Sequence, residues 1–143
     1  MNQEQIELVQ ASWKKALVVG DAAAQLFYTR LFTLDPSLRP MFKGDMWQQG
    51  RKLVAMITVA VNGLSRIETL VPAIEALGRR HAGYGVQDRH YATVAEALLW
   101  TLEQGLGKDF TPETKQAWIE AYGLLASTMQ NGAKAQVQQA KAA

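Results

Sequence analysis

Leu77-Gly78-Arg79-Arg80-His81-Ala82-Gly83-Tyr84-Gly85-Val86 is the stretch of sequence that decides the fold. It ends a segment that the apolar spacing predicts to be an amphipathic helix. Ile74, Leu77 and His81 lie at positions i, i+3 and i+7 of this segment, so they share one face of the helix. That face is otherwise apolar, and a buried polar group without a partner costs about 1–3 kcal/mol. The function of the chain therefore depends on what His81 meets inside the protein.

Helical patterns occupy most of the chain on both sides of this stretch. Apolar residues recur at helical spacing from Ile6 to Leu17, Ala24 to Phe32, Leu53 to Leu64, about Pro72 to Arg80, Tyr91 to Leu106 and Trp118 to Met129. Breaks are predicted at Gly20-Asp21, at Asp35-Pro36 and through residues 36–46, and caps at Asn2 with Gln5 and at Thr111-Pro112. No segment alternates like a strand, and no internal repeat is evident.

These patterns predict an all-α domain of about six long helices and one or two short ones. We assign this domain to residues 1–131. Residues 132–143 form a polar tail rich in Ala, Gln and Lys with almost no apolar face. We expect this tail to fray or to extend into solvent.

Composition excludes several classes of protein. The chain of 143 residues contains no cysteine, which excludes thiolate catalysis and cysteine-ligated metal sites. The formal net charge is +2, and Lys and Arg are scattered without a basic run, so nucleic acid is not an expected partner. Residues 1–10 lack a secretory signal, and no apolar stretch approaches the length of a membrane span. We expect a soluble, cytoplasmic protein with no membrane partner.

Several polar side chains lie on the predicted apolar faces. His81 is either a core histidine bonded to a backbone carbonyl, the commoner case, or a ligand of iron in a flat cofactor against the helix. Gln49 lies at the inner edge of the stripe around Leu53, where it either faces water or offers a neutral donor to a small ligand. Tyr28 and Tyr91 lie in apolar stripes. The common interpretation of each is a buried tyrosine whose hydroxyl bonds a carbonyl.

The sequence allows two interpretations for each of three further residues. Phe42 lies in the broken segment, where its ring either fills the core or presses on a cofactor. Lys52 neighbours an inward position, so it either lies on a solvated face or reaches a carboxylate at the rim of a pocket. We expect His90 to be exposed or to cap a helix, with no ligand role. No phosphate-binding loop, nucleophile elbow or zinc motif competes with these candidates.

The order and spacing of several short stretches resemble those of the globin family over roughly residues 4–131. The resemblance is to single-domain bacterial globins and to neuroglobins. The stretches that carry it are Ser12-Trp13, Leu31-Phe32, Leu34-Asp35-Pro36, Met41-Phe42, Arg51-Lys52, Leu77 to His81, Gly85-Val86, Ala117-Trp118 and Ala121-Tyr122-Gly123.

The resemblance implies a globin fold around haem b (iron protoporphyrin IX). His81 matches the proximal histidine that ligates the iron. Tyr28 matches the distal tyrosine of bacterial globins, and Gln49 falls at the distal position where many animal globins have histidine. Phe42 matches the phenylalanine that wedges the haem. The other pocket positions that the resemblance implies are Lys52 near a propionate, Leu53 over the iron, and Leu77, Val86, Tyr91 and Val94 on the proximal side.

Two departures from related globins change the expected chemistry. Gln49 bonds iron less readily than imidazole, so the histidine-bridged state of neuroglobins is not expected. Flavohaemoglobins pair the proximal histidine with a tyrosine and a glutamate. Tyr91 keeps the tyrosine, but Ala133 stands where the glutamate is expected, which weakens the case for peroxidase-like and dioxygenase chemistry.

The resemblance therefore implies a globin that reversibly binds oxygen with high affinity and slow release, serving in oxygen transport, and that also binds carbon monoxide and nitric oxide. The second expectation is an enzyme, a nitric oxide dioxygenase working with a separate reductase. A gas-ligand sensor and a cofactor-free helical interaction module are further alternatives. We expect a monomer or a weak homodimer.

Overall fold

The computed structural model describes the backbone of residues 1–142 and the side chains of residues 1–135. Within this range the chain is helical almost throughout and contains no strand, so the predicted all-α class is confirmed. The elements are α1 (Gln3–Val19), α2 (Asp21–Leu34), the 3-10 helix η1 (Pro36–Met41), α3 (Met46–Asn62), η2 (Leu64–Thr69), α4 (Val71–Gly83), α5 (Asp88–Leu106), η3 (Gly107–Asp109) and α6 (Pro112–Ala142).

Local sequence signals explain where the helices begin and end. The Asn2 side chain accepts the Gln5 backbone N–H at 2.8 Å, and the Gln5 side chain accepts the Asn2 N–H at 3.1 Å. Helices α1 and α2 meet at Gly20, whose φ of 63° lies in the region that favours glycine. Helix α6 follows Thr111, whose hydroxyl accepts the Thr114 N–H at 3.2 Å. The predicted boundaries at these three places are confirmed.

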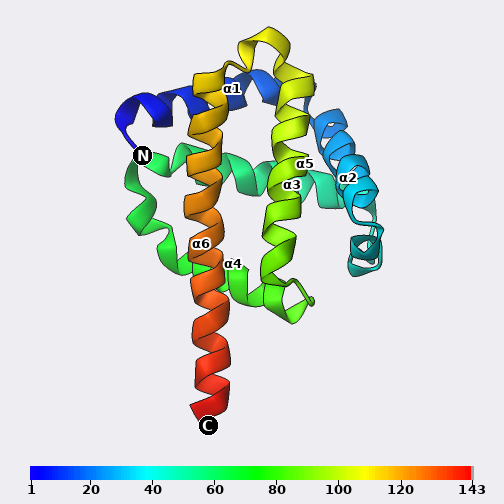
Figure 1. The fold of residues 1–143 in the computed structure, drawn as a ribbon, viewed down its shortest axis with the longest axis vertical. Helices are drawn as coiled ribbons and strands as arrows, with labels where there is room; N and C mark the ends of the chain where they lie inside the picture. The colour runs from blue at the N-terminus through cyan, green and yellow to red at the C-terminus, as the bar shows by residue number, and fades with distance from the viewer. Residues whose placement is uncertain (143) are drawn as a thin grey trace.

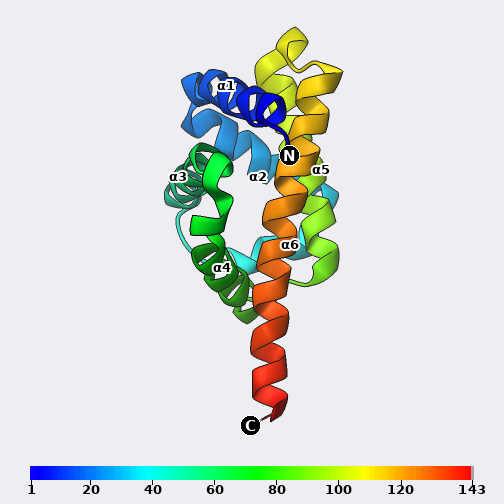
Figure 2. The ribbon, with the colours of Figure 1, turned by 90° about the vertical axis from the view of Figure 1, so that its left-hand side faces the viewer.

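The long helix α6 lies between α5 on one side and α3 and α4 on the other. Helices α5 and α6 run side by side, and α1 crosses them at one end of the molecule (Figure 1). After a turn of 90°, α3 and α4 lie on the side away from α5 (Figure 2). Helix α2 packs against α3 and α5, whereas α4 packs mainly against α6.

The core consists of two clusters. The first joins α1, α3, α5 and α6 and contains Trp13 and Trp118, whose ring centroids are 5.9 Å apart. The Trp118 indole donates to the Ser12 hydroxyl at 2.8 Å, and the Trp13 indole donates to the Thr58 hydroxyl at 2.9 Å. Both polar atoms of the two tryptophans are thereby satisfied inside an apolar core.

The second cluster joins α2, η1 and α5 and continues onto α3. Its buried members are Phe27, Tyr28, Leu31, Leu38 and Ala97, and its partly buried members include Phe42, Leu53 and Val94. No apolar residue of α4 belongs to either cluster. Helix α4 therefore lies outside the two clusters, although its Ile74 is buried and its Leu77 and His81 are half-buried.

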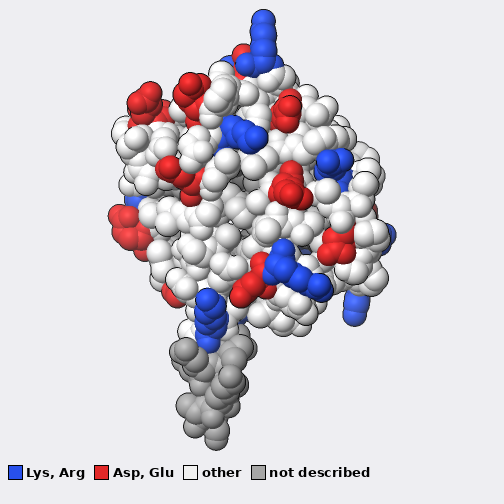
Figure 3. Space-filling view, viewed as in Figure 1, with Lys and Arg blue, Asp and Glu red and all other residues white. Residues whose placement is uncertain are grey.

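On the face of the molecule that carries α5 and α6, charged side chains do not gather into a large patch of one sign. Acidic and basic side chains alternate across it (Figure 3). Among the described residues, Lys15 and Asp109 form the one ion pair, at 3.5 Å and in contact with solvent. None of the described helices is long and apolar enough to cross a membrane.

Helix α6 continues beyond the point where the tail was predicted to begin. Its backbone stays helical to Ala142, and Gly132 is buried. The side chains of residues 136–143 lie outside the described part of the chain. The division into residues 1–131 and 132–143 stays a prediction.

Candidate functional site

His81 lies in the last turn of α4 and is half-buried. Its Nδ1 is 2.8 Å from the carbonyl oxygen of Leu77. A carbonyl can only accept a hydrogen bond, so Nδ1 carries the proton in the neutral ring and Nε2 keeps its lone pair. Burial lowers the pKa of His81, the bond to Leu77 raises it, and the nearby Arg80 lowers it further. His81 is therefore neutral at pH 7 and has one nitrogen oriented and available to bind a metal.

Tyr28 is held by aromatic rings on α2 and on the segment after η1. It is 4% exposed, and its ring centroid lies 5.1 Å from that of Phe27, 6.0 Å from Phe32 and 5.3 Å from Phe42. This packing leaves the ring little freedom to turn. Burial raises the pKa of Tyr28, and a hydrogen bond with the Gln49 side chain acts in the opposite direction. The hydroxyl therefore stays protonated and can donate at neutral pH.

Gln49 comes to Tyr28 because α2 and α3 approach each other closely. A Cβ atom placed on Gly50 would lie 3.0 Å from the Ala24 Cβ and 2.9 Å from Nε2 of Gln25. Gln25 also donates from Nε2 to the Met46 carbonyl at 2.9 Å, which ties the start of α3 to α2. The half-buried Gln49 amide and the Tyr28 hydroxyl are thus neighbours in space. In the chain they are separated by the end of α2, by η1 and by the start of α3.

The other pocket candidates fall into three groups in the structure. Phe42, Leu53 and Val94 pack against the second core cluster with Tyr28. Leu77, Val86 and Tyr91 are half-buried and belong to neither cluster. Lys52 is exposed, which agrees with a place at the rim. The structure therefore gathers Phe42, Leu53 and Val94 around Tyr28, and it ties Leu77 and Val86 to His81 through backbone groups.

The residues present fit a flat apolar cofactor such as haem. Helix α4 packs closely against α6 and η2 but has no comparable backbone contact with α2 or α3. Apolar side chains come from the cluster of Tyr28 and from the half-buried Leu77 and Val86, and polar groups suited to a metal and its ligand come from His81, Tyr28 and Gln49. An enclosed apolar site with a few placed polar groups is what a cofactor of this kind needs.

The His81 ring is oriented by a neutral acceptor. The contact of its Nδ1 is with the Leu77 carbonyl, and the residue at the position expected for a glutamate is Ala133. The Tyr122 hydroxyl donates to the Tyr91 carbonyl oxygen at 2.7 Å and so ties α6 to α5. A carbonyl raises the basicity of a ligating imidazole less than a carboxylate does, so a metal held by His81 would receive a weak rather than a strong electronic push.

His90 differs from the expectation of an exposed side chain. It is 3% exposed, and its Nδ1 accepts the Gln87 backbone N–H at 2.9 Å, so the capping alternative is confirmed. Its Nε2 is buried without a hydrogen-bond partner among the described residues. The sequence indicated the cap through its position near the start of a helix, but it gave no signal for the burial, because burial results from packing against a distant part of the chain.

Sequence reasoning also missed two glycines that determine how α4 lies on α6. Gly78 and Gly132 face each other's helix backbones at a distance that no side chain could occupy. A glycine within a helix and one turn before His81 is a weak signal of such an approach. A second, matching glycine on α6 becomes meaningful only when the two helices are seen to cross.

Three tyrosines with raised pKa values predict a loss of stability in alkaline solution. Burial raises the pKa values of Tyr28, Tyr91 and Tyr122 above the usual 10.0. Above pH 10 the unfolded chain therefore loses these protons first, and the free energy of unfolding falls as the pH rises. We expect Tyr122→Phe to flatten this fall and to cost about 1 kcal/mol at pH 8 through the lost hydrogen bond.

Urea unfolding at pH 8, 10 and 11 measures both effects. Tyr84→Phe is the matched control, because Tyr84 is 64% exposed. A wild-type stability that stays constant between pH 8 and 11 would contradict the prediction.

Comparison with known proteins agrees with this site. The globin family model matches residues 25–129. Neuroglobin of Danio rerio is 31% identical over 139 residues, which cover 87% of this chain and 87% of the relative. Flavohemoprotein of Bordetella parapertussis is 33% identical over 113 residues, which cover 77% of this chain and 28% of that longer protein. The similarity to the flavohemoprotein is thus confined to a minor part of that protein.

Solved structures show the same fold. An engineered carbene transferase derived from RmaNOD, a Rhodothermus marinus protein provisionally assigned as a nitric oxide dioxygenase, superposes with a TM-score of 0.86 at 29% identity and covers 100% of this chain and 99% of its own. A hexacoordinated haem protein of an anhydrobiotic tardigrade gives a TM-score of 0.84 at 14% identity over 94% and 96% of the two chains, which shows a shared fold. The family match over most of the chain and the identity with neuroglobin show that this chain belongs to the globin family, whose members bind haem and small gas ligands.

Proposed function

We propose that this globin binds oxygen reversibly at haem b, with high affinity and slow release. The observation that carries the proposal is the buried Tyr28 side chain, which packs against the rings of Phe27, Phe32 and Phe42 and has Gln49 as a neighbour. Haem, when bound, supplies the iron at which oxygen, carbon monoxide and nitric oxide bind. The chain contains no cysteine to attach a haem covalently, which supports the b type.

His81 is proposed to hold the cofactor. Its Nδ1–H is occupied by the Leu77 carbonyl at 2.8 Å, so Nε2 is the nitrogen that would ligate iron. Phe42, in edge contact with Tyr28, would lie against one face of the cofactor. Leu53 and Val94 would line its pocket on the Tyr28 side, and Leu77, Val86 and Tyr91 on the His81 side. The exposed Lys52 would reach a propionate at the rim.

Tyr28 and Gln49 are proposed to set the lifetime of bound oxygen. An oxygen ligand held at haem iron would carry more negative charge than a carbon monoxide ligand held there. Two neutral donors in an apolar, partly water-excluded pocket favour the more negative ligand. At about 1–1.5 kcal/mol for each hydrogen bond, the pair slows oxygen release by roughly one to two orders of magnitude.

Absorption spectroscopy tests the proposal directly. Purified protein supplied with haem is expected to develop a Soret band, and the ferrous form is expected to change its spectrum reversibly on addition and removal of oxygen. Absence of the Soret band would overturn haem binding. A ferrous form that is oxidised at once without a reversible oxygen spectrum would overturn reversible oxygen binding.

Nitric oxide dioxygenation is the second candidate function. The similarity to a flavohemoprotein and to a structure derived from RmaNOD supports it. One nitric oxide and one oxygen molecule would be converted to nitrate, with one electron per cycle supplied by a separate reductase. The neutral acceptor behind His81 argues against it, because it provides little electronic push. Sustained nitric oxide consumption with a reductase and NADH, with nitrate as product, would favour the enzyme over the oxygen carrier.

A further inference from the structure

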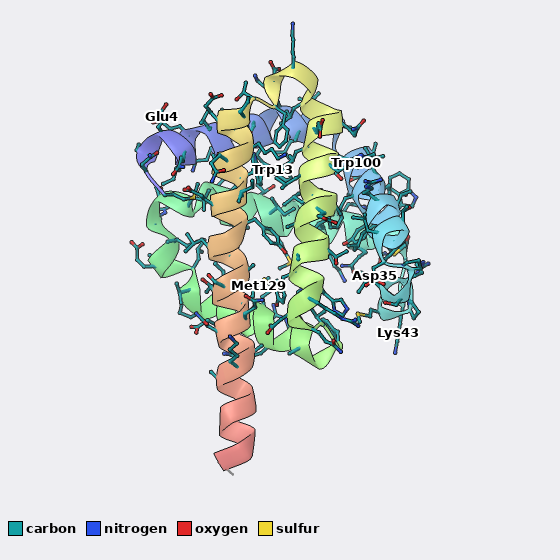
Figure 4. All side chains as sticks on the ribbon, in the orientation of Figure 1. Glu4, Trp13, Asp35, Lys43, Trp100 and Met129 are labelled. Atoms are coloured by element: carbon teal, nitrogen blue, oxygen red, sulfur yellow. The ribbon has the colours of Figure 1, made fainter. Side chains whose placement is uncertain are left out.

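Helix α4, which carries His81, is held in the protein chiefly by α6. Its closest packing is with α6, and a smaller contact is with η2. Helix α4 passes behind α6 in Figure 1 and lies beside it in Figure 2, and Figure 4 labels Met129 on α6 at this level. Since no apolar residue of α4 belongs to the two core clusters, this crossing determines where α4 lies.

The crossing is a direct contact of two helix backbones. A Cβ atom on Gly78 would lie 2.5 Å from the Met129 carbonyl carbon and 2.6 Å from its Cα. A Cβ atom on Gly132 would lie 2.7 Å from the Cα and the carbonyl carbon of Glu75. Real Cβ atoms do not approach other atoms this closely. The obstacle in both cases is backbone, which cannot turn away as a side chain can, so any larger residue must move one helix relative to the other.

The contact is linked to His81 by the geometry of α4. Gly78 lies one helical turn before His81, and Leu77, whose carbonyl accepts from the His81 ring, is the residue next to Gly78. A shift of α4 away from α6 at Gly78 therefore moves both the histidine and the group that orients its ring.

We propose that the crossing of Gly78 on Met129 and of Gly132 on Glu75 sets the position of the His81 ring for iron ligation. Gly78 and Gly132 are positioning residues that act through His81. The inference rests on the proposed role of His81 as the haem ligand. It also gives a structural task to Gly132, which lies in the segment that composition marks as a polar tail.

Alanine substitutions test the proposal against matched glycines of the same helices. We expect Gly78→Ala and Gly132→Ala to raise the rate of haem loss at least about 10-fold, since outer contacts that orient a metal ligand typically change affinity by 10–100-fold. The iron–histidine stretching band of the ferrous protein should shift as well. The controls are Gly83→Ala on α4 and Gly123→Ala on α6, where a Cβ atom would meet nothing within 4 Å. They should leave the rate of haem loss and the band unchanged.

Free imidazole, which is not attached to α4, distinguishes a positioning role of the two glycines from a general loss of stability. In His81→Gly supplied with haem and free imidazole, the ligand is no longer attached to α4. Adding Gly78→Ala to this background should leave the iron–imidazole band unchanged, although it shifts the band of the protein that retains His81. An equal shift in both backgrounds would overturn the proposal, because the effect would then not pass through His81.

The remaining outcomes are also decisive. Glycine variants that behave like wild type in haem loss and in the stretching band overturn the positioning role while leaving haem binding intact. Failure of both alanine variants to fold, judged by circular dichroism of the haem-free protein, would show that the crossing serves folding and would overturn the proposal. A wild-type protein that binds no haem, or a His81→Ala protein with an unchanged band, would instead overturn the proposed function.

Discussion

Replacing His81 with alanine is expected to reduce haem affinity by at least about 100-fold, because the substitution removes the iron ligand itself, and even the loss of a group that only orients a ligand costs 10–100-fold. His81 is half-buried, neutral at pH 7, and oriented through Leu77 so that Nε2 is available. No other imidazole is placed to substitute for it, since His90 is buried in a helix cap. Titration of the haem-free protein with haemin, followed through the Soret band, measures the loss.

The second histidine of the chain is the control for this experiment. His90→Ala removes a hydrogen bond to the Gln87 N–H and is expected to lower the free energy of unfolding by about 1 kcal/mol. It should keep the wild-type affinity for haem. Free imidazole is expected to restore the spectrum of His81→Gly but not to change that of His90→Ala. A His81→Ala protein that retains haem with a wild-type spectrum would contradict the assignment of the ligand.

Removing the two distal donors is expected to speed oxygen release by about 10-fold for each substitution, because each would abolish a hydrogen bond of about 1–1.5 kcal/mol to bound oxygen. The variants are Tyr28→Phe and Gln49→Leu, which keep the size of the side chains. The two side chains are neighbours, so their effects should not add fully in the double variant. Stopped-flow measurement of oxygen dissociation from the ferrous protein gives the rates.

Carbon monoxide and a third tyrosine provide the controls. The carbon monoxide dissociation rate should change less than the oxygen rate, because this ligand is less negative when bound. Tyr84→Phe alters an exposed tyrosine and should leave oxygen release unchanged. Oxygen rates unaffected by either distal substitution would remove the donor roles. Equal changes for both gases would point to altered pocket size instead.

Much of the helical framework follows from short-range signals in the sequence. The capping pair Asn2 and Gln5, the break at Gly20 and the cap at Thr111 each act through atoms within a few residues, so their positions could be predicted and are confirmed. The region around Gly132 shows the limit of this reasoning. Its composition has almost no apolar face, yet Gly132 is buried, because it packs through its backbone and needs no hydrophobic side chain to do so.

The residues of the candidate site also differ in whether the sequence alone could predict their positions. By itself the sequence determined that His81 lies on an inward helical face, because the spacing of Ile74, Leu77 and His81 is a local property of a helix. Only the tertiary structure decided that Tyr28 and Gln49 lie together, that His90 is buried, and that α4 rests on α6 through Gly78 and Gly132. These contacts join residues far apart in the chain, and they arise from how closely whole helices approach one another, which no local pattern of side chains specifies.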